Sequence, residues 1–131
     1  MAASVSATVT QSVSMSGAPF SSIATTIVGS SSCIVEKTYT AGLSEDTGAV
    51  FTAGDLQLLY LLSDSSNGMV TFTGTSGTDT VALVAGVAQI FNLVASPASD
   101  PTVVATGQVQ IFFENTGAVT TDLHVRLITL S

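Results

Sequence analysis

The stretch DLQLLYLLSDSSNGMVTFT (residues 55–73) contains the pattern that decides the fold: an apolar segment, a turn, and an alternating segment. Its first part places apolar side chains on both faces of an extended chain: Leu56, Leu58, Tyr60 and Leu62 on one face, Leu59 and Leu61 on the other. A strand that is apolar on both faces is usually covered on both. We therefore expect a central strand over Asp55–Leu62, or one covered by a neighbouring subunit.

The second part of this stretch predicts a chain reversal followed by a half-buried strand. Asn67-Gly68 is a strong turn signal because these residues adopt positive φ at little cost. After it, Met69–Thr73 alternates between apolar and hydroxyl side chains, as a strand with one buried face does.

The N-terminal residues 1–16 show the plainest alternation in the chain. Apolar side chains occupy one face and hydroxyls the other: Val5, Ala7, Val9, Val13 and Met15 against Ser4, Ser6, Thr8, Thr10, Ser12 and Ser14. This pattern predicts an extended strand or arm, which either pairs within the domain or reaches a neighbour.

Further strands are expected where β-branched residues lie between Gly, Ser, Asn and Asp breaks. These are Phe20–Val28, Cys33–Thr40, a hairpin of Thr80–Ala85 and Val87–Val94 around Gly86, Gly107–Glu114 and Leu123–Leu130, with Ala41–Gly48 as a polar loop. Helix-favouring Glu, Lys and Arg are scarce. The prediction is an all-β chain: a single-domain antiparallel β-sandwich over residues 1–131, jelly-roll-like, with about eight or nine strands.

Composition argues against several classes of function. The net charge is −7, and Lys37 and Arg126 are the only Lys or Arg residues in the 131-residue chain. Two cations cannot neutralise several phosphates, so we expect no nucleic-acid partner and no anionic membrane surface. Charged residues make up 8% of the chain, well below the roughly 25% of ordinary soluble domains. A hydroxyl-rich surface with so little charge suits a protein that packs into an assembly.

Cys33 and His124 are the only residues of their types, and neither has a catalytic context. A lone cysteine rules out an intrachain disulfide, and we expect Cys33 to be a small buried hydrophobe. We expect His124 to be a packing residue of the last strand. The start Met1-Ala2-Ala3-Ser4 lacks the basic and apolar regions of a signal peptide, so we expect synthesis in a cytoplasm without export by such a signal.

Asp46-Thr47-Gly48-Ala49 matches the Asp-Thr-Gly-Ala string of retroviral-type aspartic proteases. Those enzymes need two carboxylates that share a proton, which a homodimer would supply. Here Leu43-Ser44-Glu45 precedes the motif in place of a hydrophobic strand, and Glu45 adds an unwanted charge. We interpret the motif as a polar turn and keep the hydrolase as a rival hypothesis.

The remaining candidates for binding sites are turn residues and tyrosines. Asp64–Gly68 has the composition of a calcium loop, but its glycine comes one position early and no terminal Glu follows. Asp79, Asp100 and Asp122 are expected to cap backbone groups in turns. Aromatic residues make up 6% of the chain and Trp is absent, which argues against a sugar-stacking site, although Tyr39 and Tyr60 could still form one. We expect no catalytic, metal or cofactor-binding residues and no enzymatic activity.

The middle and end of the chain resemble small structural proteins of tailed bacteriophages. The shared pattern is an apolar strand ending in Ser-Asp, a Val-Thr strand, an apolar-Ala-Gly hairpin and an Asn-x-Gly turn before a last apolar strand. It is carried by LQLLYLLSD (56–64), MVTFT (69–73), DTVALVAGV (79–87), VQIFFENTG (109–117) and Leu123–Leu130.

The resemblance implies a virion protein of the head-decoration or cement type with a jelly-roll-like sandwich. Its partners would be the major capsid protein and copies of itself, by analogy a homotrimer, and it would lie on the capsid surface. It would bridge neighbouring capsid subunits. The rival within the same class is a tail, neck or fibre component that contacts a host.

Overall fold

The computed structural model describes residues 5–13, 16–17 and 21–130, with the backbone alone for 11–13 and 21–23. The described part of the chain holds ten strands and one short 3-10 turn. These are β1 (Val5–Val13), β2 (Ser21–Gly29), β3 (Ser31–Tyr39), β4 (Ser44–Thr52), β5 (Leu56–Ser63), β6 (Gly68–Thr73), β7 (Thr78–Leu83), β8 (Gln89–Asn92), η1 (Pro97–Ser99), β9 (Gln108–Asn115) and β10 (Thr121–Thr129).

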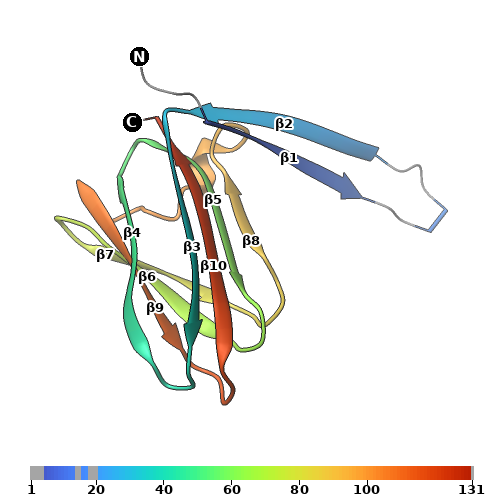
Figure 1. Cartoon of the computed structure of the whole chain (residues 1–131). Coiled ribbons are helices and arrows are strands. Elements are labelled where there is room, and N and C mark those ends of the chain that lie inside the picture. Colours follow the sequence, from blue (N-terminus) through green and yellow to red (C-terminus); the bar gives the residue numbers. More distant parts are fainter. Residues whose placement is uncertain (1–4, 14–15, 18–20, 131) are drawn as a thin grey trace.

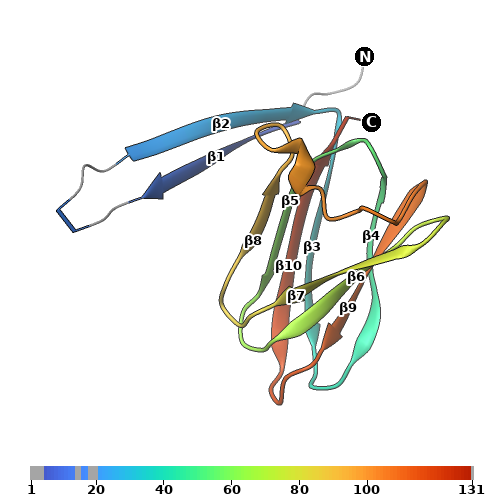
Figure 2. The ribbon, with the colours of Figure 1, turned by 180° about the vertical axis from the view of Figure 1, so that it is seen from behind.

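Strands β3 to β10 form two stacked four-stranded antiparallel sheets (Figures 1 and 2). One sheet has the order β3-β10-β5-β8 and the other β4-β9-β6-β7. The antiparallel pairs are nested: β3 with β10, β4 with β9, β5 with β8, and β6 with β7. This is the winding of a jelly roll, in which one long folded ribbon is rolled into two sheets. The predicted fold class is confirmed.

The core lies between the two sheets and follows the period of two in the sequence. Strand β9 contributes Val109, Ile111 and Phe113, and β10 contributes Leu123, Val125 and Leu127 from the opposite sheet. Two aromatic pairs in this core make edge-to-face contacts: Tyr39 with Phe113 at 4.9 Å and Phe51 with Phe72 at 6.3 Å between ring centroids. Such pairs add to the stabilisation from buried area.

Strand β5 is central in its sheet, between β10 and β8, as its two-sided apolar pattern predicts. Leu59 and Leu61 face the core between the sheets, whereas Leu58 packs on the outer face with Ile27 and Ile128. The prediction was wrong for Leu56, which belongs to the core and not to the face of Leu58. The pairing with β10 shifts register between Ile128 and Thr129, and this irregularity inverts the alternation at the start of β5.

Two expected local structures differ from the observed ones. The hairpin around Gly86 does not form, because β7 and β8 lie in opposite sheets and the chain crosses between them there. The expected polar loop Ala41–Gly48 is half strand, since β4 begins at Ser44. The observed pairs are β7 with β6, β8 with β5, and β4 with β9. Local composition does not reveal which strand each segment pairs with.

The Asn67-Gly68 turn is also a crossover between sheets, from β5 to β6. Gly68 does not have the positive φ that the prediction invoked. Its small size matters instead, because a Cβ there would overlap the ring of Phe113. The same end of the sandwich is tied together by buried Asn115, whose amide donates to the carbonyls of Tyr39 and Val119.

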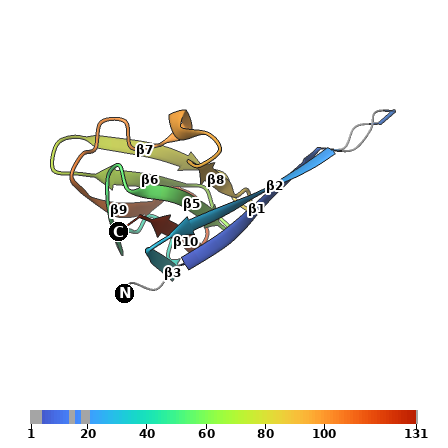
Figure 3. The ribbon, with the colours of Figure 1, turned by 90° about the horizontal axis from the view of Figure 1, so that it is seen from above.

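The N-terminal segment forms a hairpin, β1–β2, outside the two sheets. It runs across one end of the β3-β10-β5-β8 sheet and projects beyond it (Figure 3). Of the two options for residues 1–16, pairing within the chain is observed for Val5–Val13. The expectations for Met15 and for the side chain of Val13 lie outside the described residues. We call β1–β2 the arm and the two stacked sheets the body.

Candidate functional site

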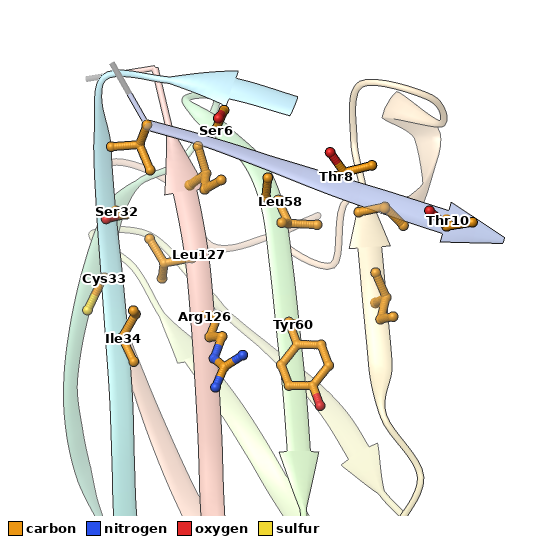
Figure 4. Close-up of a pocket in the computed structure, with 15 residues that line it drawn as sticks. Ser6, Thr8, Thr10, Ser32, Cys33, Ile34, Leu58, Tyr60, Arg126 and Leu127 are labelled. Carbon is orange, nitrogen blue, oxygen red and sulfur yellow. The ribbon is translucent and has the colours of Figure 1, made fainter. Parts of the chain in front are cut away.

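A groove of about 430 Å³ lies between the arm and the outer face of the β3-β10-β5-β8 sheet. Strand β1 crosses over β10 and β5 and forms its roof (Figure 4). The sheet supplies the floor, with residues from β3, β5, β8 and β10. The groove is therefore a product of the arm being laid on the body.

The groove borders a small second core, with which it shares Leu58 and Ile128. Ile27 of the arm is fully buried against Leu58 and Ile128 of the sheet, and Val5, Ala7 and Val9 pack on this cluster. A backbone hydrogen bond joins the end of the arm to β10 here: the amide of Ser30 donates to the carbonyl of Thr129 at 2.9 Å. The alternation of β1 explains the contact, since its apolar face meets the sheet and its hydroxyl face meets solvent.

Farther from this core, the sheet side of the groove is formed by four partly or largely exposed residues. We call this part of the sheet face the open wall: Ile34, Tyr60, Ile90 and Arg126. Ile34 is 68% exposed and Ile90 49% exposed, which is high for side chains of this size in strands. Arg126 lies over the ring of Tyr60 at 5.8 Å and donates to Glu36 at 3.2 Å. The one cation of the groove lining is thus already paired.

A row of charged side chains continues from the open wall along the same sheet face. His124 Nε2 lies 2.8 Å from Asp64 Oδ2, and its Nδ1 lies 3.5 Å from Glu36 Oε1. The hydrogen bond to Asp64 is the main cause that raises the pKa of His124, against the opposing effect of burial. The hydrogen bond from Arg126, followed by that from His124, lowers the pKa of Glu36.

This arrangement offers no nucleophile activated by a base. Cys33 is half-buried and packs on the core between the sheets, whereas His124 lies on the outer face of its sheet. The expectation of a buried small hydrophobe is thus met in part, because Cys33 also lines the groove. The structure does not bring the Cys33 thiol and the His124 imidazole together. What the groove provides chemically is an apolar surface bordered by hydroxyls, suited to burying another apolar surface.

Asp46-Thr47-Gly48-Ala49, the protease-like string, forms an irregularity in β4 and not a turn between strands. The register with β9 shifts between Asp46 and Val50, and Gly48 has φ of 85°. Asp46 is exposed and its Oδ1 accepts a hydrogen bond from the amide of Gly48 at 2.8 Å. Thr47 is buried and donates to the carbonyl of Ile111. The local structure is a β-bulge, which accounts for the glycine without an active site.

The Asp64–Gly68 segment uses its polar groups within the protein. Asp64 pairs with His124, the Ser66 hydroxyl donates to Asn115 Oδ1 at 2.7 Å, and Asn67 Oδ1 accepts from the amide of Ala85. In the part of the chain that the structure describes, no group of three or more His, Cys, Asp or Glu residues could hold a metal ion.

The three other aspartates accept hydrogen bonds from nearby groups. Asp79 Oδ2 accepts from the amides of Val104 and Ala105, and Asp100 Oδ1 accepts from the amide of Thr102, as predicted for capping. Asp122 accepts instead from the hydroxyl of Thr38. Asp79 and Asp122 belong to strands β7 and β10, so their expected placement in turns was wrong.

The two tyrosines have different environments. Tyr39 is fully buried in the core, which excludes it from stacking on a ligand, and burial is the main cause that raises its pKa to about 12. Tyr60 lines the groove and is partly exposed. Sequence reasoning missed Ile34 and Ile90 of the open wall. A signal was present at β3, where apolar side chains at 33, 34 and 35 occupy both faces, as they do in β5.

Among the described residues, no helix has the length and apolar character needed to cross a membrane. Comparison with known proteins leaves the family open, because no family model matches the chain and no curated protein matches it either.

The chain is similar to two solved structures. One is Peruvianin-I, a cysteine peptidase from Thevetia peruviana latex, with 14% identity, a TM-score of 0.46, and coverage of 76% of this chain and 52% of that chain. The other is the Drosophila melanogaster CENP-C cumin domain, with 9% identity, a TM-score of 0.41, and coverage of 72% and 56%. The chain spans about half the length of these structures. At such scores and identities neither likeness bears on function.

Proposed function

We propose that this chain is a structural component of a virus particle, a decoration or cement protein that bridges neighbouring subunits of a major capsid protein. The observation that carries the proposal is the projecting arm: an apolar-and-hydroxyl hairpin extends from a jelly-roll body (Figure 1). Jelly rolls are common in viral capsid domains, which supports the proposal without deciding it.

The distribution of charge supports an adhesive role. Residues 1–35, which include the whole arm, contain no Asp, Glu, Lys, Arg or His. All nine acids and both basic residues lie at positions 36–131. An uncharged strand pair can be buried against another protein without the cost of desolvating an ion, which reaches several kcal/mol per ion. The arm is thus suited to contact with protein, while the acidic body keeps the molecule soluble.

Bridging a capsid does not require a tight single contact. Many copies on one particle act together, so each contact needs to contribute only a few kcal/mol to resist expansion or rupture of the shell. Buried apolar area at the arm and groove supplies energy of this order, at about 25 cal/mol per Å² before the costs of association are subtracted.

The test uses particles with and without the protein. We expect particles stripped of it to release their genome at lower temperature or at lower chelator concentration, and re-addition of purified protein to restore the original stability. Antibody labelling should be spread over the head. Unchanged stability on removal would refute the cement role, and label confined to the tail would favour the tail or fibre alternative.

A further inference from the structure

We propose that the arm of one copy packs along the open wall of a second copy, so that this chain assembles with itself through its groove. This inference deepens the proposed function, since it rests on the chain being a building block. It names the two surfaces that join the copies: strands β1 and β2 on one side, and Ile34, Tyr60, Ile90 and Arg126 on the other.

The arm is longer than its own contact with the body. Its pairing runs from Val5 with Gly29 to Val13 with Ser21. Among the described side chains of the arm, those packed on the outer-face cluster belong to its base: Val5, Ala7, Val9 and Ile27. Beyond this base the paired backbone projects past the sheet (Figure 3). A free two-stranded hairpin is marginally stable in water, so the projecting half needs a further surface.

The open wall has the character required of that surface. It is continuous with the patch of Leu58 and Ile128 that already receives the arm of the same chain. Its isoleucines are among the large apolar side chains left exposed, and the β3-β10-β5-β8 order places them on strands at the two edges of one sheet face. Figure 4 shows Ile34, Arg126 and Tyr60 together on the sheet below the crossing strand. A strand pair of the same composition can therefore pack beside the first.

Charge favours a second copy over a partner of other chemistry. The arm carries no ionisable Asp, Glu, Lys, Arg or His, and the Arg126 of the open wall is paired with Glu36. The charges at and beside the open wall are already paired, Arg126 with Glu36 and His124 with Asp64. A charged partner would compete with these pairs, whereas the uncharged arm does not. Two bodies of net negative charge repel, and an arm without charged residues adds no like charge to the contact between them.

Each copy carries both of the proposed surfaces. The projecting strands and the open wall are both on one chain, so a single type of contact covers both surfaces on every copy. Such a head-to-tail contact gives a ring where its rotation closes and an open filament where it does not, or a dimer if two arms are exchanged. A foreign partner bound at one of these surfaces would leave the other exposed.

The experiment measures the mass of the purified full-length protein by light scattering after size exclusion. We expect wild type to elute as a defined oligomer of the 13.2 kDa chain. Ile34→Glu and Ile90→Glu, which place a carboxylate on the open wall, should shift the protein to the monomer mass. The matched control is Val103→Glu, at an 81% exposed valine away from the groove, which should elute as wild type does.

Several results would overturn the inference. A wild-type protein that stays monomeric at ~1 mM would overturn it. An oligomer that survives both groove substitutions would overturn it as well. Binding of an apolar dye by a monomeric wild type would assign the groove to a small ligand instead. Folding is checked by the strand signal in circular dichroism. If Ile34→Glu loses it, Ile34→Gln replaces that variant under the same mass criterion.

The failure of this inference and that of the proposed function are distinguishable. A protein that assembles through the groove but leaves particle stability unchanged would refute the cement role alone. A protein that stabilises particles while remaining a monomer would refute the self-association alone.

Discussion

At the scale of single residues, Tyr39 is unusual because its hydroxyl is buried without a hydrogen-bond partner among the described residues. The ring packs edge-to-face on Phe113, so the side chain serves the core as an aromatic. A buried polar group left unpaired costs about 1–3 kcal/mol relative to a paired one.

Tyr39→Phe should therefore keep the ring contact and remove the unpaired hydroxyl. We expect the free energy of unfolding to rise by about 1 kcal/mol, measured by urea denaturation. Phe72→Tyr, which adds a hydroxyl to another fully buried ring, should have the opposite effect. A loss of stability in Tyr39→Phe would show that the hydroxyl has a partner in solution.

His124 gives the folded protein a pH dependence of defined sign. Its pKa is raised above the ordinary value of 6.5, mainly by the hydrogen bond to Asp64. A group with a raised pKa in the folded state stabilises it fully below pH 6.5, and this contribution is lost as pH rises through the folded-state pKa. Glu36 stays ionised over that range, because its own pKa is lowered from 4.5.

Asp64→Asn should thus reduce stability more at about pH 5.5 than at about pH 9, as chemical denaturation at the two pH values would show. Asp46→Asn is the matched control. It removes the same charge at an exposed site where the new amide oxygen can still accept from Gly48. Equal losses at both pH values in Asp64→Asn would mean that His124 does not pair with Asp64 in solution.

At the scale of elements, the arm is attached to the body mainly through the cluster around Ile27. Because this cluster is separate from the core between the sheets, the arm can open while the body stays folded. Gly29 is part of the attachment, since a Cβ there would overlap the carbonyl of Thr129 and the side chain of Ile128.

Ile27→Ala should weaken this attachment. Removing a buried isoleucine side chain costs about 2–5 kcal/mol where the site cannot collapse. We expect faster hydrogen exchange at the amides of β1 and β2, with unchanged protection in β9 and β10. Thr26→Ala, one residue away on the exposed face, is the control. Loss of protection throughout the protein would show that arm and body unfold as one unit.

At the scale of the whole molecule, the nested pairing makes most contacts within the two sheets of the body long-range in sequence, with β6–β7 as the local pair. The first strand of the body pairs with the last, with Ser31 opposite Thr129, and the second pairs with the next to last. Loop-closure entropy must be overcome before these contacts form, and proteins of such topology fold slowly.

Refolding should accordingly take milliseconds to seconds in a stopped-flow dilution from denaturant, well slower than the microseconds of small helical proteins. The arm substitution Thr26→Ala should leave this rate unchanged, since the hairpin pairs locally and lies outside the two sheets. Folding in microseconds would contradict the nested long-range pairing.

The sequence by itself determined the fold class and most strand positions, because both depend on local alternation. The period of two in β9 and β10, and the two-sided apolar pattern of β5, are visible without a structure. The uncharged N-terminal alternation likewise predicted an extended element. Side-chain alternation is a property of each strand alone, so no knowledge of its partner is needed.

Tertiary structure decided which strands pair, which turns cross between sheets, and where the groove lies. Local sequence suggested a hairpin at Gly86, but β7 pairs with β6 and β8 pairs with β5, in different sheets. Ile34, Ile90 and Arg126 are far apart in the sequence and share one sheet face only because β10 and β5 lie between β3 and β8. Pairing depends on the summed energy of contacts between distant segments, and that sum exists only in the folded chain.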